Sequence, residues 1–171
     1  DRAVPTDTYK NLSPGVAYVG MQTCKSCHAN VHSTFIHTGM GRSFDRATRE
    51  KTDAKFGAHA VVYDEASDLY YHPFFRDSQM YVLEYRLEGL DTVHQRLEKI
   101  DYIVGSGQHT NSHMVDFNGY LYQAPVTYYT QEDRWDMAPG FRGDNIRFSR
   151  LLSAECITCH NHLPEQVPGS M

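Results

Sequence analysis

The chain has 171 residues, 40% of them hydrophobic, which suits one folded domain with a buried core. Its 16 Lys and Arg stand against 21 Asp and Glu, and a net charge of −5 without a basic block argues against a nucleic-acid partner. No run reaches the ~20 apolar residues of a membrane span, and twelve Tyr with eight Phe exclude a disordered chain.

The first 20 residues are rich in Pro, Thr, Gly and Tyr and predict an irregular arm. A helix is predicted next, from about Cys24 to Thr38. Thr23 can cap its start, and Gly39 is a natural stop.

From about Phe56 to Tyr129 the hydrophobic period changes from that of a helix to that of a strand. Tyr and Leu alternate with other residues over 81–88, a pattern typical of a half-buried strand. Turn clusters at 64–68, 76–78 and 88–91 separate neighbouring strands, and Asn118-Gly119 is the strongest hairpin signal. We therefore predict an antiparallel β-meander over residues 55–130.

The last predicted element is a short helix from about Ser149 to His160. Ser149 or Ser153 can cap it, and it closes before Pro164. No internal repeat or low-complexity segment is visible elsewhere in the chain.

All four cysteines lie in two copies of C-x-x-C-H, the attachment signature of c-type haem. The two-residue gap lets both thiols form thioethers to the vinyl groups of one porphyrin, and the next histidine then lies under the iron. The sequence thus predicts two covalently attached haem c groups. Their thioether residues are Cys24, Cys27, Cys156 and Cys159, and their proximal iron ligands are His28 and His160.

Other uses of the cysteines fit less well. Two knuckles of a Cys₄ zinc site lie typically ~15–20 residues apart, whereas residues 28–155 separate these pairs, and zinc leaves both histidines unexplained. A disulfide within C-x-x-C would be strained and redox-active, and a thioredoxin-like motif needs a βαβ context that neither flank shows. Since this haem attachment takes place outside the cytoplasm, we expect a periplasmic or extracellular protein and interpret Asp1 as the start of a mature chain.

These elements predict an α+β fold in which two haem-bearing helices flank an antiparallel β-meander. We expect one dihaem domain over residues 1–171. Its parts are a first haem segment (16–45), the meander (55–130) and a second haem segment (149–163).

The residues around the motifs resemble those of periplasmic multihaem c-type cytochromes. The resemblance covers most of residues 16–163 and is carried by residues 18–20, 38–43, 105–109, 121–126, 134–141 and 156–161. Members are often longer, so this chain is either a compact dihaem version or a fragment. The resemblance implies electron transfer and does not identify the redox partner.

Each iron needs a distal ligand or an open site. Met40 stands between Gly39 and Gly41, which permit a close turn over a porphyrin, and the resemblance implies a methionine there. His109 follows a Gly-Ser-Gly turn that matches the family's Gly-Ser-Gly-x-His segment. We expect Met40 on the first iron and His109 on the second, although Met40 could instead fill space near a haem edge. Alternative ligands are His37, His113 and His162.

We expect an electron carrier rather than an enzyme, acting between redox proteins that are basic at the docking surface. One alternative is a haem enzyme with one open iron and a small substrate, for which the distal acid–base candidates are His59, His72 and His94. Another alternative is a haem subunit of a larger oxidoreductase, an oligomer, or a cytochrome filament.

Overall fold

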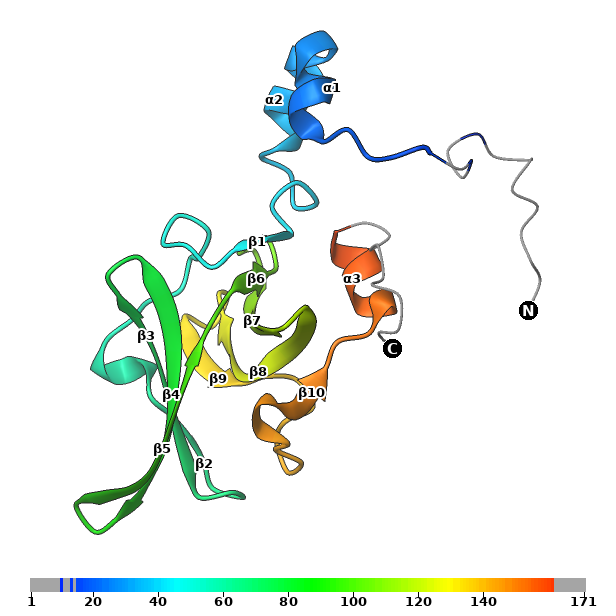
Figure 1. Ribbon diagram of the computed structural model, residues 1–171. Coiled ribbons are helices and arrows are strands. Elements are labelled where there is room, and N and C mark those ends of the chain that lie inside the picture. Colours follow the sequence, from blue (N-terminus) through cyan, green and yellow to red (C-terminus); the bar gives the residue numbers. More distant parts are fainter. Residues whose placement is uncertain (1–9, 11–12, 14, 162–171) are drawn as a thin grey trace. The chain divides into compact units, whose positions relative to one another are not determined.

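The computed structural model describes residues 10, 13 and 15–161 (Figure 1). Strands make up 40% and helices 19% of the structure, so the protein is mostly β. By its internal contacts the chain divides into two compact units, Asp1–His37 and Thr38–Met171. Across the described residues, no helix is both long and apolar enough to span a membrane.

The described part of the chain contains short helices and longer strands. The helices are α1 (Met21–Cys27), α2 (Ala29–Phe35) and α3 (Ala154–His160), and the 3₁₀ turns are η3 (Ala58–Ala60) and η4 (Arg147–Ser149). The strands are β1 (Phe44–Arg46), β2 (Val62–Asp64), β3 (Leu69–Arg76), β4 (Gln79–Glu88), β5 (Asp91–Lys99), β6 (Tyr102–Val104), β7 (Thr110–Phe117), β8 (Tyr120–Tyr129), β9 (Arg134–Met137) and β10 (Arg150–Leu151).

Sheet B has four antiparallel strands in the order β2-β3-β4-β5. Its turns fall in the three predicted turn clusters, and Asp68, Asp77 and Gly89 take the positive φ angles that tight turns need. The β4–β5 hairpin ends at Leu90, which is 100% exposed. The predicted turns of this sheet are therefore confirmed.

Sheet A has six strands in the order β1-β6-β7-β8-β10, with β9 also paired to β8. All of these pairs are antiparallel. Asn118 (φ 54°) and Gly119 (φ 88°) form the two-residue turn between β7 and β8. The strongest hairpin prediction is confirmed.

The main hydrophobic core takes its side chains from both sheets. Val62, Tyr71 and Val82 of sheet B share one buried cluster with residues of sheet A such as Val126 and Trp135. A second cluster joins Val104, Met114 and Ile157. Because successive strand residues point to opposite faces, Val104 and Met114 face away from the main core, and α3 covers this other face of sheet A.

The predicted fold class is wrong: the protein is mostly β, with two sheets instead of two haem-bearing helices around one meander. The expected meander breaks after Lys99, where the chain leaves β5 and enters sheet A at β6. Each motif helix has only seven residues, too few to form a layer. Hydrophobic period indicates that a strand forms, but it does not indicate which sheet the strand joins.

The predicted helix from Cys24 to Thr38 is also interrupted. It consists of α1 and α2, which meet at His28 with φ −120° and ψ 44°, outside the helical region. Thr23 does not cap α1, because its hydroxyl donates to the carbonyl of Val19 (2.9 Å) and the N-cap residue is Gly20.

The predicted strand over 81–88 exists as β4, but the opposite face is buried. Met80, Val82 and Glu84 point into the core. The alternating Tyr and Leu side chains form the half-buried outer face of sheet B, and they are Tyr81, Leu83, Tyr85 and Leu87.

Candidate functional site

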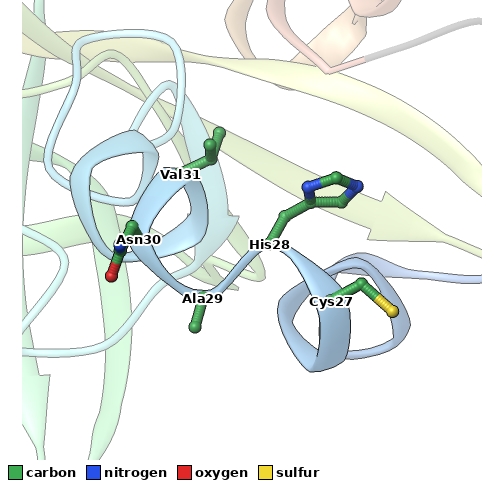
Figure 2. Close-up of a pocket in the computed structure, with 5 residues that line it drawn as sticks. All are labelled: Cys27, His28, Ala29, Asn30 and Val31. Atoms are coloured by element: carbon green, nitrogen blue, oxygen red, sulfur yellow. The ribbon is translucent and has the colours of Figure 1, made fainter.

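The first C-x-x-C-H motif lies at the C-terminal end of α1. Cys24 and Cys27 are free thiols at exposed positions, and His28 ends the helix. Figure 2 shows the Cys27 sulfur and the His28 imidazole projecting on the same side of the junction between α1 and α2. A pocket of about 300 Å³ is lined by residues 27–31, a volume at the lower limit of known ligand sites.

The second motif lies on α3, of which Ile157 is the buried residue. A helix turns about 100° per residue, so Cys156, Cys159 and His160 share a sector of about 100° that lies to one side of Ile157. All three are exposed. The helix thus packs on sheet A through Ile157, and both thiols and the imidazole stay accessible beside that contact.

A porphyrin fits the first motif because the segment around it has no core of its own. Neither α1 nor α2 contains a buried residue. Val19 and Val31 are 67% and 65% exposed, and Val16 and Met21 are exposed as well. Two short helices with this much apolar surface in water need a further apolar group to cover them, and a haem supplies one.

Apolar side chains also surround the helix of the second motif. Phe44 and Tyr102 stack with their ring centroids 5.1 Å apart and pack with Leu152 against the cluster that contains Ile157. The donor set is the same as in the first motif, two free thiols and one imidazole. Both motifs therefore fit covalent haem.

The Met40 turn, residues 38–43, precedes β1. The hydroxyl of Thr38 accepts from the N–H of Gly41 (3.0 Å), and the N–H of Ser43 donates to the carbonyl of Met40 (3.1 Å). The Met40 side chain is 79% exposed. The turn is therefore ordered by its backbone, while the thioether stays accessible.

The His109 turn, residues 105–109, is held by tight contacts. Lys51 donates from Nζ to the carbonyl of Gly105 (2.6 Å), and burial lowers the pKa of this ammonium. Gly105 has φ +109°, and a Cβ there would lie 2.1 Å from the carbonyl oxygen of Thr110. His109 itself is exposed at the end of the turn. The fixed turn thus presents an imidazole to solvent.

The alternative ligands lie in different surroundings. His37 is exposed in the unit Asp1–His37. His113 is fully buried in the core, with Nδ1 3.3 Å from the carbonyl of Val126 and its ring stacked on Trp135. His162 lies outside the described residues. Among these three, His113 is closed in by protein on all sides.

One end of sheet A brings together several of the predicted ligand segments. At this end β1 begins beside Ser43, β6 ends at Val104 just before Gly105, and β7 begins at Thr110. The hydroxyl of Ser43 lies 2.5 Å from the carbonyl of His160. The Met40 turn, the His109 turn and the second motif therefore meet within one unit, and His28 belongs to the other unit.

Sequence reasoning missed two polar features. Ser43 carried no signal, because its contact with His160 spans 117 positions of the chain. Glu84 is fully buried and accepts hydrogen bonds from Tyr71 (3.1 Å) and from Nε of Arg147 (2.9 Å). The only signal for it was a carboxylate inside an otherwise apolar alternation.

Across residues 10, 13 and 15–161, no three His, Cys, Asp or Glu side chains cluster in a way that could hold a metal ion by themselves. Comparisons of the chain with family models, with curated proteins and with solved structures gave no match. The two motifs and their surroundings are therefore the features that indicate what the protein does.

Proposed function

We propose that this protein is a dihaem c-type cytochrome that transfers electrons between redox partners outside the cytoplasm. The observation that carries the proposal is shared by both motifs: two free thiols and a histidine lie exposed on one short helix. The uncovered apolar side chains of the first unit and the resemblance to periplasmic multihaem c-type cytochromes support it.

The cysteines attach each porphyrin covalently. A thiol adds across a vinyl double bond, so that its sulfur bonds to one vinyl carbon and its proton moves to the other carbon. When bound, haem c supplies a one-electron Fe(III)/Fe(II) couple. His28 and His160 hold the irons from the proximal side, and the neighbouring apolar side chains limit access of water to each site.

The expected partners are redox proteins with a basic docking surface. The chain has a net charge of −5, and the haem propionates add further negative charge. Complementary charge steers encounters and raises association rates, and interfaces of electron-transfer proteins are small. We therefore infer transient docking whose rate falls as salt concentration rises.

Mass spectrometry under denaturing conditions tests the attachment. The chain, produced in cells that mature c-type cytochromes, should be heavier by two haems. Replacing Cys27 or Cys159 by Ala should leave the corresponding haem on one thioether, which a pyridine haemochrome spectrum detects as a shifted absorption band. Haem that acid-acetone extracts from the wild-type chain, or zinc in its elemental analysis, would contradict the proposal.

A second pair of variants tests the proximal ligands. His28→Ala and His160→Ala should each abolish normal ligation at one haem while both haems stay attached through their thioethers. His59→Ala is the matched control, because His59 lies exposed in η3 outside both motifs. A control with the same spectral change as the two motif variants would contradict the assignment.

A further inference from the structure

Ser43 connects the Met40 turn, the His109 turn and α3. Its N–H donates to the carbonyl of Met40 (3.1 Å), and its carbonyl accepts from the N–H of Gly105 (2.7 Å). Its hydroxyl lies 2.8 Å from the carbonyl of Met40 and 2.5 Å from that of His160, and it can donate to one of them at a time. One residue thus links the Met40 turn to the C-terminal end of the second motif helix.

The Met40 side chain is exposed on the turn that Ser43 links to that helix. It is 79% exposed, which leaves its thioether available as a ligand and its apolar surface in contact with water. The atoms nearest to a Cβ at Gly39 would be the Oγ of Ser106 (3.8 Å) and the Oε1 of Gln108 (3.9 Å), so the turn rests against the His109 turn. Both turns belong to the unit Thr38–Met171, together with α3.

We propose that Met40 is the distal ligand of the iron whose proximal ligand is His160, and that Ser43 positions the Met40 turn for this ligation. The inference depends on the haem attachment proposed above. It differs from the expectation based on sequence alone, which placed Met40 on the first iron because its glycine-flanked turn follows the first motif helix and the resemblance implies a methionine there. The hydrogen bonds of Ser43 locate the Met40 turn beside the second motif, and they indicate its position more directly than its place along the chain does.

The ligand decides the direction of electron flow. Methionine is a poorer donor to Fe(III) than imidazole, so a His/Met haem has the higher reduction potential. With Met40 on the second iron and a histidine as the distal ligand of the first, the electron rests on the haem of α3. Transfer from the first haem to the second is then downhill.

Variants that retain a single haem distinguish the two assignments of Met40, to the first iron or to the second. The full-length chain with Cys24→Ala and Cys27→Ala retains the second haem, and its ferric form should show the near-infrared sulfur-to-iron band. Met40→Ala in the same chain should remove the band. The reciprocal chain with Cys156→Ala and Cys159→Ala should lack the band, so either chain alone decides the question if the other does not fold.

The outcomes distinguish the inference from the proposed function. A band that disappears with the first haem, while the second haem stays attached, overturns the inference. A wild-type chain with two attached haems and no such band also overturns it and leaves the proposed function standing. A chain without covalent haem overturns the proposed function itself.

The hydroxyl of Ser43 is tested separately. Ser43→Ala should weaken the band and lower the potential of the second haem, and Ser43→Thr, which keeps a hydroxyl, should restore both. Ser26→Ala is the matched control, because Ser26 lies inside the first motif, between Cys24 and Cys27, and its hydroxyl donates to the carbonyl of Thr23 (2.7 Å). An unchanged band and potential in Ser43→Ala would overturn the positioning role.

Discussion

The fully buried carboxylate of Glu84 is held by three neighbours from separate parts of the chain. Burial opposes its ionisation, but hydrogen bonds from Arg147 and His94 outweigh this effect and keep the pKa of Glu84 below its ordinary value. His94 approaches it to 3.0 Å through Nε2, and Tyr71 donates its hydroxyl (3.1 Å). The charge therefore depends on Arg147, which comes from η4.

Arg147→Ala should lower the free energy of unfolding by about 3 kcal/mol, because it leaves a buried charge without its main partner. Urea unfolding followed by circular dichroism measures the change. Lys55→Ala is the control: it removes an ion pair with Asp133 that is exposed at both ends, for which the expected loss is much smaller. Equal losses of unfolding free energy in the two variants would contradict the expectation that a buried ion pair contributes more than an exposed one.

His113 is a second buried polar residue, and its charge state affects stability. Burial lowers its pKa to about 4, and within the described structure its Nε2 has no hydrogen-bond partner. The unfolded chain binds the proton with an ordinary pKa near 6.5. Between these values the unfolded state holds more protons, so stability falls as pH drops from about 6.5 to about 4.

The total loss should be about 3 kcal/mol by pH 4, from 1.36 kcal/mol per pKa unit. His113→Phe should flatten the dependence of unfolding free energy on pH between about pH 5 and 7, whatever its absolute stability. Met114→Leu, a packing change without an ionisable group, should keep the wild-type slope. An unchanged slope in His113→Phe would show that another group titrates in this range.

Among the elements, β4 illustrates that an alternating pattern does not show which face is buried. Its Tyr and Leu residues line the outer face of sheet B, where Tyr70 stacks between Tyr63 (4.5 Å) and Tyr85 (5.1 Å). The inner face carries Val82 and the charged Glu84. The Tyr and Leu face is the more apolar of the two, yet the inner face carries the buried carboxylate, and its ion pair with Arg147 makes this burial possible.

The turns contain glycines with different constraints. Gly119 has φ +88° and open space where a Cβ would lie, whereas a Cβ at Gly105 would lie 2.1 Å from a backbone oxygen. Gly119→Ala should cost about 1 kcal/mol, from backbone strain alone. Gly105→Ala should cost about 3 kcal/mol or more, because the backbone of Thr110 must also move.

Thermal or urea unfolding of the two variants measures this difference. Ferric spectra add a second measurement, since movement of the His109 turn should disturb the neighbouring Met40 turn in Gly105→Ala and not in Gly119→Ala. Equal costs would mean that the turn of residues 105–109 relaxes freely.

At the scale of the molecule, the two units differ in how they are stabilised. The unit Thr38–Met171 has a core between two sheets, whereas no residue of α1 or α2 is buried. We therefore expect the first unit to depend on the proposed first haem for order. In the chain with Cys24→Ala and Cys27→Ala, proteolysis within residues 16–37 should become faster, while the sheets stay resistant.

Limited proteolysis with mass mapping of the fragments gives this comparison. The chain with Cys156→Ala and Cys159→Ala is the control, and its cleavage within residues 16–37 should match that of the wild type. Faster cleavage throughout the sheets in the first variant would show that the first haem also stabilises the second unit.

The sequence by itself determined the features that depend on neighbouring residues. The two C-x-x-C-H motifs need only local spacing, and the Asn118-Gly119 turn and the turn clusters of sheet B depend on the conformational preferences of a few residues. These local predictions located the hairpin turns of both sheets and singled out thiols that are exposed. The role of His28 and His160 as proximal ligands stays a prediction. The same reasoning placed Met40 and His109 at turns, and both side chains are exposed in the structure.

Only the tertiary structure decided the arrangement of these parts. The division into two sheets after Lys99, the buried face of β4 and the contact of Ser43 with His160 each depend on groups far apart in the chain. A period of two residues shows that two faces alternate, and it contains no information on which face meets a partner. The buried face and the links between turns are set by long-range packing and by the need of each buried polar group for a partner.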